Sequence, residues 1–400
     1  MKQSAVDERM KSSVSIFLDF SRWSAAFLVV LGHAAHFLAA GFDREQDMSI
    51  AVGVAYFAIS LGHAAVMVFF VISGYLVGGI TCNRWMKSGP DVIEYAISRF
   101  SRIYTVLVPA LIVGYALDAA GMHWLDGHGL YSNVGAYPIG SLDAVEVRLS
   151  PLVFIGNLLM MQTVHVTSLG SNGPLWSLAY EWWYYVVFCL ALMGALYRGT
   201  ARIAAVVLLG ALAIILPSAM FLWMVIWLLG TATFFLCKSG RLRPHPALAA
   251  AIFLATLVST YQLEALQVID HTRTTSFLLD LAVAASYCLL LLSVARDDFR
   301  FPMERFHRWA AGFSYSMYLF HFPAMLLLVA LGNEYAGLPL LTPFSPTVWL
   351  RVGLLVAMVY VLGYGFSMLT ERYTDEIRRS LRKGVRSFAI SRVQGGPEPD

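Results

Sequence analysis

Charged residues are scarce in this sequence. Asp, Glu, Lys and Arg make up 13% of its 400 residues, whereas hydrophobic residues make up 58%. A soluble domain carries about a quarter charged residues. The shortage therefore excludes a soluble globular protein and predicts an all-α, polytopic membrane helix bundle. No nucleic-acid partner is expected for such a chain, whose net charge is only +3.

Cysteine is also rare, and its positions exclude two kinds of site. The four cysteines are Cys82, Cys189, Cys237 and Cys288. They form no CxxC pair and no Cys/His spacing of the kind that binds a metal ion. Three of them lie in apolar runs of the sequence. We therefore expect neither a disulfide scaffold nor a metal site.

Long apolar runs fill most of the chain. Runs suitable for membrane spans fall near 16–40, 51–80, 103–120, 175–197, 202–217, 219–237, 246–263, 275–294, 311–331 and 347–370. An eleventh run, 151–165, is short for a crossing of ~20 residues and contains Asn157 and Gln162. The sequence leaves open whether this run is re-entrant or spanning.

Positive charge favours one orientation of these runs. If the N-terminus is cytoplasmic and 151–165 does not cross, the cytoplasmic segments hold 23 of the 28 Lys and Arg residues. This is the distribution that the positive-inside rule favours. The sequence therefore predicts about ten spans with both termini cytoplasmic. It also predicts a membrane domain over 1–370 and a basic cytoplasmic tail over 371–400.

Two ionisable residues lie inside the first apolar run. Arg22 and His33 are eleven positions apart, which places them on nearly the same face of a helix and ~16 Å apart along its axis. A charged or titratable group within a membrane span is costly, so an aligned pair predicts a functional site. The alternative is a snorkelling arginine and a histidine bonded to a nearby carbonyl.

A second basic group precedes the third apolar run. Arg99 and Arg102 are three residues apart in RFSRIY, so both side chains can reach one ligand. Arginine suits phosphate because its planar fork binds two oxygens at once. An isolated pair of this kind is usually explained by the positive-inside rule alone. Together with Arg22 near the same face of the membrane, the pair predicts an anion site.

Other ionisable residues lie in later spans. Glu181 lies inside a predicted span, where an acid favours a functional role. If its helix lies close to the first, Glu181 could orient the imidazole of His33. For His63 and His321 we expect structural hydrogen bonds slightly ahead of catalysis. The small residues of FFVISGYL, Ser73 and Gly74, allow close approach of a helix or a ligand.

Five stretches together resemble the acyltransferase-3 family of integral membrane acyltransferases, which includes polysaccharide O-acetyltransferases. They are LDFSRWSAAFLVVLGH, VFFVISGYL, RFSRIYTVLVP, NGPLWSLAYEWWYYVVF and GFSYSMYLFHFP. They occur in order from residue 18 to about 323, so the resemblance covers most of the chain. The paired acids usual in the family are replaced here by Tyr180 and Glu181. The hydrolase-like domain appended to some members is absent from this sequence.

The resemblance implies an acyl-CoA-dependent O-acyltransferase of the bacterial cytoplasmic membrane. The donor would be acetyl-CoA or another acyl-CoA, bound from the cytoplasm as a substrate and not as a tightly bound cofactor. The acceptor would be a hydroxyl of an envelope or exported glycan, with polysaccharide-assembly proteins as further partners. Carried over residue by residue, it places His33 and Glu181 in catalysis and Arg22, Arg99 and Arg102 at the donor.

Other classes of membrane protein remain as alternatives. A secondary transporter or exporter of a glycan or small metabolite also places His, Arg and Glu within spans. The sequence has no internal repeat of the kind that many transporters contain. A glycosyltransferase that uses lipid-linked sugars would need acids at a membrane face, and Asp19 is the only acid near Arg22. Acceptor-dependent release of coenzyme A distinguishes the acyltransferase from these alternatives.

Overall fold

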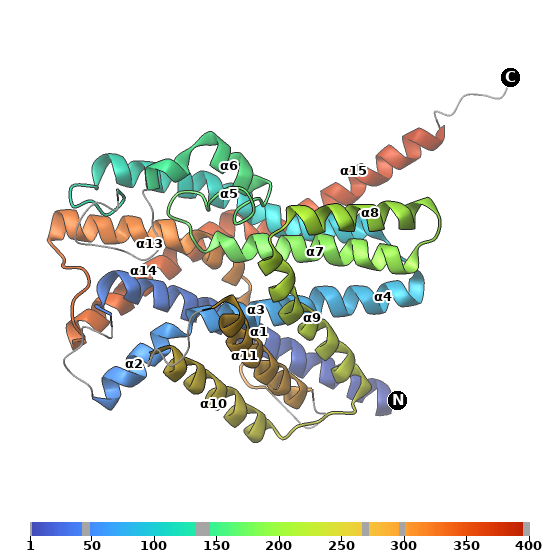
Figure 1. Ribbon diagram of the computed structural model, residues 1–400, viewed down its shortest axis with the longest axis horizontal. Helices are drawn as coiled ribbons and strands as arrows, with labels where there is room; N and C mark the ends of the chain where they lie inside the picture. Colours follow the sequence, from blue (N-terminus) through green and yellow to red (C-terminus); the bar gives the residue numbers. More distant parts are fainter. Residues whose placement is uncertain (1, 42–48, 133–144, 266–271, 296–300, 395–400) are drawn as a thin grey trace.

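The computed structural model describes residues 2–41, 49–132, 145–265, 272–295 and 301–394. In these ranges the chain forms helices joined by short connections, and no β-strand element occurs among them. Figure 1 shows the start of α1 (Lys2–Leu38) and the end of α15 (Thr374–Gln394) toward the same end of the bundle. The predicted all-α polytopic bundle is confirmed.

Nine helical segments in the described ranges are long and apolar enough to cross a membrane. They lie in α1, α3 (Gly62–Ser73) continued by η2 (Gly74–Gly79) and α4 (Ile80–Ser88), α5 (Val92–Trp124), α7 (Leu175–Leu196), α9 (Ser218–Ser239), α10 (Pro246–Ala265), α11 (Arg273–Val294), α13 (Ser314–Ala336) and α14 (Pro346–Leu369). Another apolar helix, α8 (Thr200–Ile215), packs along α7 and leads the chain back to α9. The sequence predicts a tenth span at this helix, and its 16 residues are fewer than those of each of the nine candidate spans.

The apolar run 151–165 is not a span. Only Pro151–Leu158 is helical, as α6, and eight residues reach about 12 Å, well short of a ~30 Å hydrocarbon core. Near the end of α6, the amide of Asn157 donates to the carbonyl of Thr167 at 2.8 Å and accepts from the backbone of Leu169 at 3.1 Å. These bonds fold the connection into a compact turn that leads into α7.

The second span is broken in two places. The short helix α2 (Ile50–Ser60) precedes α3, and η2 is a π-helical turn that lies against α9. A Cβ atom on Gly74 would lie 1.8 Å from the carbonyl oxygen of Trp227, and one on Gly78 would lie 2.0 Å from Oγ1 of Thr231. A larger side chain at either position would force the two helices apart. The close approach expected around Gly74 is therefore confirmed.

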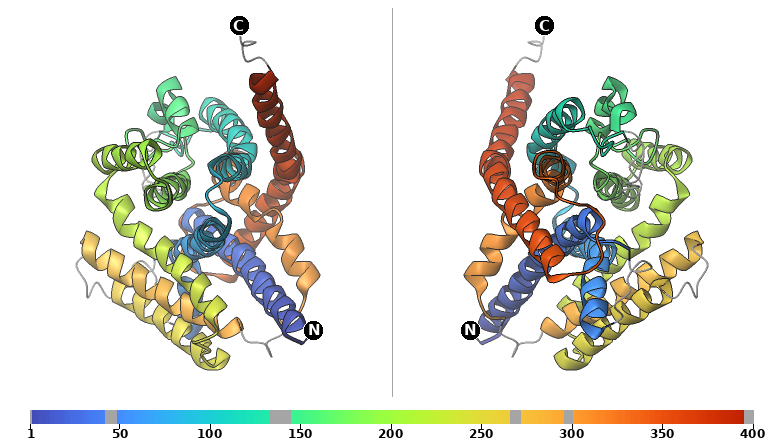
Figure 2. Two further views of the ribbon diagram at one scale, coloured as in Figure 1. Left: turned by 90° about the vertical axis from the view of Figure 1, so that its right-hand side faces the viewer. Right: turned by 90° about the vertical axis from the view of Figure 1, so that its left-hand side faces the viewer.

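The tail folds back onto the bundle. It begins with η4 (Glu371–Tyr373) and continues as α15, which packs along α5. Arg382 of α15 donates from Nε to a carboxylate oxygen of Glu94 on α5 at 2.8 Å. Figure 2 shows α5 and α15 on one side of the molecule, with α9, α10 and α11 grouped on the other. Residues 395–400 of the tail lie outside the described ranges.

The remaining short helices are η3 (Val145–Leu149) and α12 (Glu304–Ala311). α12 packs on α1, where the indole N–H of Trp23 donates to Nδ1 of His307 at 2.9 Å. The largest hydrophobic cluster joins α1, α3, α5, α7, α9 and α11. A second cluster packs α1 against α13 and α14. α1 therefore belongs to both clusters, which fixes the helix that carries Arg22 and His33.

Candidate active site

A cavity of about 360 Å³ lies among α1, α3 with η2, α5, α7 and α13. Arg22 of α1, Arg99 and Arg102 of α5 and Glu181 of α7 all line it. Four of the five residues predicted for the site therefore share one cavity, although they come from three spans. The fifth, His33, lies on the same helix as Arg22.

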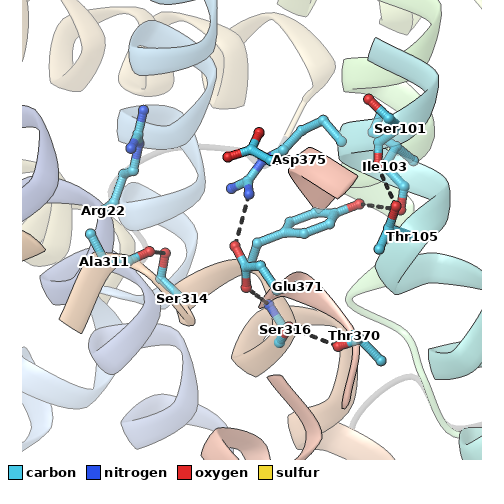
Figure 3. A network of polar contacts seen from close by, with 12 residues as sticks. Arg22, Ser101, Ile103, Thr105, Ala311, Ser314, Ser316, Thr370, Glu371 and Asp375 are labelled. Carbon is cyan, nitrogen blue, oxygen red and sulfur yellow. Dashed lines mark hydrogen bonds and ion pairs between the residues drawn. The ribbon is translucent and has the colours of Figure 1, made fainter. Parts of the chain in front are cut away.

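Two of the three arginines that the predicted spans contribute to this cavity are paired with carboxylates. Arg102 donates from Nη1 to Oε1 of Glu371 at 2.8 Å, and the backbone N–H of Ser316 donates to Oε2 at 3.0 Å. The side chain of Glu371 is only 5% exposed, so this pair joins α5, η4 and α13. Nη1 of Arg22 lies 3.1 Å from Oδ1 of Asp19. Figure 3 shows Glu371 beside Ser316, with Arg22 on a neighbouring helix.

Arg99 has no carboxylate partner in the described part of the chain. Its Nη2 donates to Oγ of Ser98 at 2.9 Å, and its buried Nε makes no hydrogen bond with the described residues. The guanidinium lies 6.0 Å from the ring centre of Tyr95 and 5.8 Å from that of Tyr185. A guanidinium has five N–H donors, so most of those of Arg99 are unused. Such a group, lining a cavity, is suited to an anionic ligand.

A fourth arginine comes from the tail. Arg378 of α15 lines the same cavity, with its Nη1 3.1 Å from Asp375 and its Nε donating to Ser101 at 3.3 Å. Sequence reasoning missed both Arg378 and Glu371. Neither lies in an apolar run, and their positions resemble ordinary charges of a basic tail. The tail therefore adds one more cation to a cavity that already contains three.

Glu181 accepts the last bond of a polar chain across three helices. The indole N–H of Trp227 donates to Oγ of Ser73 at 3.0 Å. Ser73 lies 3.1 Å from the hydroxyl of Tyr185, which donates to Oε1 of Glu181. Because an indole only donates, the Ser73 hydroxyl is free to donate to Tyr185. Every hydrogen bond in this series can donate toward the carboxylate of Glu181. Hydrogen bonds aligned in series strengthen one another.

The far end of the cavity is lined by hydroxyl groups. Oγ of Ser177 on α7 lies 2.7 Å from the hydroxyl of Tyr318 on α13, and both residues line the cavity. One turn further along α13, Nδ1 of His321 lies 2.8 Å from the carbonyl oxygen of Tyr318. The cavity therefore ends one helical turn from a buried histidine.

His33 and His321 form a direct pair in which the carbonyl of Tyr318 determines the tautomers. A carbonyl oxygen only accepts hydrogen bonds, so Nδ1 of His321 carries a proton. In the neutral ring Nε2 of His321 is then an acceptor, and Nδ1 of His33, 2.8 Å away, is the donor. Nε2 of a neutral His33 is left with an available lone pair. The arrangement prepares His33 to accept a proton.

The pairing considered between Glu181 and His33 does not occur among the described contacts. His33 pairs with His321, and Glu181 is bonded to Tyr185. The partner that orients His33 is therefore a second histidine. His321 has the buried hydrogen bonds expected of a structural residue, and its other ring nitrogen contacts the ring of His33.

His63 takes the structural hydrogen bonds expected for it. Its Nε2 lies 2.9 Å from Oδ1 of Asp280 on α11, and the indole of Trp223 on α9 donates to Oδ2 at 2.7 Å. The cluster ties α3 to α9 and α11. It lies outside the residues that line the cavity.

Comparison with known proteins gives one match. A family model described as an acyltransferase domain matches residues 15–368. Neither a curated protein nor a solved structure matches the chain. The matched range includes Arg22, His33, Arg99, Arg102 and Glu181. Glu371 and Arg378 lie beyond it.

Proposed function

Because the chain belongs to the acyltransferase-3 family of membrane acyltransferases, we propose that it transfers an acetyl group from acetyl-CoA to a hydroxyl of an envelope or exported glycan. The chain would span the inner membrane of a bacterium. The donor would enter the cavity from the cytoplasm. The observation that carries the proposal is the arginine-lined cavity, which ends one helical turn from the His33–His321 pair.

The donor is matched to the cavity by charge and by length. Acetyl-CoA joins a nucleotide diphosphate to a flexible arm that ends in a thioester. Arg99, assisted by Arg22 and Arg102, would bind the diphosphate through charge-assisted hydrogen bonds. The arm would pass Glu181, whose carboxylate can accept a bond from an amide N–H of the arm. Arg22 and His33 are ~16 Å apart along α1, a distance such an arm can cover.

The histidine pair would supply the acid–base chemistry. Nε2 of His33 takes the proton from the acceptor hydroxyl as its oxygen attacks the thioester carbonyl carbon. A carbon–oxygen ester bond forms, the carbon–sulfur bond breaks, and the leaving thiolate receives the proton from the His33 imidazolium. The hydrogen bond to His321 holds the ring and the tautomer of His33 throughout.

The test is coenzyme A release by the full chain in detergent, with acetyl-CoA and a crude glycan extract. We expect release that requires the acceptor and that falls at least ~100-fold in His33→Ala, as the loss of a general base predicts. His36→Ala is the matched control, because His36 is exposed one turn further along α1. It should retain full activity.

Two results would contradict the proposal. Undiminished acetyl transfer by a folded His33→Ala variant would remove His33 from the chemistry. Failure of acetyl-CoA to bind at all would favour the transporter alternative, which also accommodates ionisable residues in spans. A stable acetyl group recovered on His33 would replace direct transfer by a two-step mechanism.

A further inference from the structure

A second cavity, of about 760 Å³, lies between α1, η2 with α4, and α9. Arg22, Leu76 and Ile80 line both this cavity and the one described above. The two spaces therefore meet at a shared wall, with Arg22 exposed to each. Nothing in the chemistry proposed for His33 requires the second cavity.

The second cavity carries its own positive charge. Lys87 of α4 and Lys238 of α9 line it, and neither forms an ion pair within the described ranges. Nζ of Lys238 donates to Oδ1 of Asn83 at 2.5 Å. Asn83 is four residues before Lys87 on α4, so their side chains share one face of that helix. The two lysines thus line one cavity from two different helices.

The rest of the second cavity suits an aromatic base. Tyr75 and Phe234 line it, with ring centres 5.3 Å apart in an edge-to-face contact. Asp19 is an acidic residue in its wall, and this residue is already paired with Arg22. A ligand here would meet two unneutralised ammonium groups, aromatic surface and an amide. These features match a phosphorylated nucleoside better than a purely apolar ligand.

We propose that this second cavity binds the 3′-phosphorylated adenosine end of the donor, with Lys87 and Lys238 on the 3′-phosphate. The inference rests on the proposed function, because it assumes that coenzyme A is the donor. Coenzyme A has two separate anionic groups, a diphosphate and a 3′-phosphate. The molecule has two adjoining cationic cavities that share Arg22. The diphosphate lies at that shared wall, with the arm in one cavity and the nucleoside in the other.

The test compares two ligands that differ by one group. Coenzyme A and 3′-dephospho-coenzyme A are titrated against the full chain in detergent by calorimetry. We expect the wild type to bind coenzyme A ~10-fold or more tightly than the dephospho form, as charged hydrogen bonds of ordinary strength predict. In a Lys87→Ala/Lys238→Ala variant, coenzyme A should bind at most about threefold more tightly than the dephospho form. Only the binding of coenzyme A should weaken. Lys383→Ala, an exposed lysine that lines neither cavity, is the matched control.

Other outcomes overturn the assignment and separate it from the proposed function. Equal binding of both ligands by the wild type removes the phosphate site but leaves acetyl-CoA as donor. Equal weakening of both ligands in the double variant means that the lysines act through the structure of the cavity. Competition by short-chain phosphatidic acid that the double variant abolishes would identify a lipid phosphate as the ligand. If neither nucleotide binds, the proposed function fails as well.

Discussion

The two ends of the candidate site differ in the groups that they present: arginine side chains at one end and a hydrogen-bonded histidine pair at the other. At one end, arginines from α1, α5 and α15 line a cavity in which Arg102 and Arg22 have carboxylate partners and Arg99 has none. At the other, two histidines contact each other, and a backbone carbonyl determines their tautomers. At the first end, guanidinium groups from several helices carry positive charge. At the second end, the available group is a single lone pair on Nε2 of His33.

If the proposed function holds, the arginine end binds the donor and the histidine end carries out the proton transfer. Charge attraction is long-ranged and tolerates small displacements, so a cationic end can hold a flexible, multiply charged ligand. Proton transfer requires hydrogen-bond distance and a defined tautomer, so the histidine end must be rigid. Substitutions at the two ends should therefore have effects of different kinds.

The largest effect is expected from Glu371→Ala, which breaks the cationic end. It leaves the backbone N–H of Ser316 and the guanidinium of Arg102 without an acceptor. We expect a loss of roughly 3 kcal/mol in unfolding free energy, as for a broken buried pair. Thermal unfolding in detergent should move down by on the order of 5 °C. Glu376→Ala, at an exposed site on α15, should leave the midpoint unchanged.

His321→Phe should disable the histidine end without unfolding it. The Nδ1–H of His33 would lose its acceptor, so the ring would no longer be held in one tautomer. We expect kcat to fall ~100-fold, within the range for general-base catalysis, with the KM for acetyl-CoA unchanged. His321→Gln, whose amide oxygen can accept the same bond, should recover part of the rate. Equal loss in both variants would mean that His321 acts only through packing.

Arg99→Ala should give the smallest effect and the clearest distinction between the ends. Because Arg99 has no carboxylate partner in the described structure, its removal leaves no buried acid unpaired. The KM for acetyl-CoA should rise about tenfold, equivalent to ~1.4 kcal/mol, with kcat and thermal stability unchanged. Arg84→Ala, an exposed arginine on α4 outside both cavities, is the control. A drop in kcat with constant KM would place Arg99 in the chemistry instead.

Local periodicity explains why much of the site could be predicted. Arg22 and His33 share one helix, as do Arg99 and Arg102, so their relative positions follow from helix geometry alone. That Glu181 lines the cavity with the arginines fits the functional role expected for an acid in a span. The family model matches a range that contains all five residues predicted for the site.

Contacts between distant parts of the chain could not be predicted in this way. Arg102 and Glu371 are 269 positions apart, and His33 and His321 are 288 positions apart. A single sequence contains no signal for either pairing. Glu181 was the only acid considered for His33, so the partner that orients the imidazole was missed. The break at Leu61, which divides the second apolar run into α2 and α3, was also not predicted from hydropathy.

The docking of α15 has a practical consequence for anyone producing this protein. Its Arg378 lines the first cavity and its Arg382 holds Glu94 of α5, so the helix forms part of the wall of that cavity. We expect a chain cut after α14 to keep the apolar helices of the described ranges but to lose Arg378 from the lining of the cavity. If the proposed function holds, we expect shortened chains that insert normally to bind the donor more weakly than the full chain does. Affinity tags are better placed beyond Gln394 than in exchange for α15.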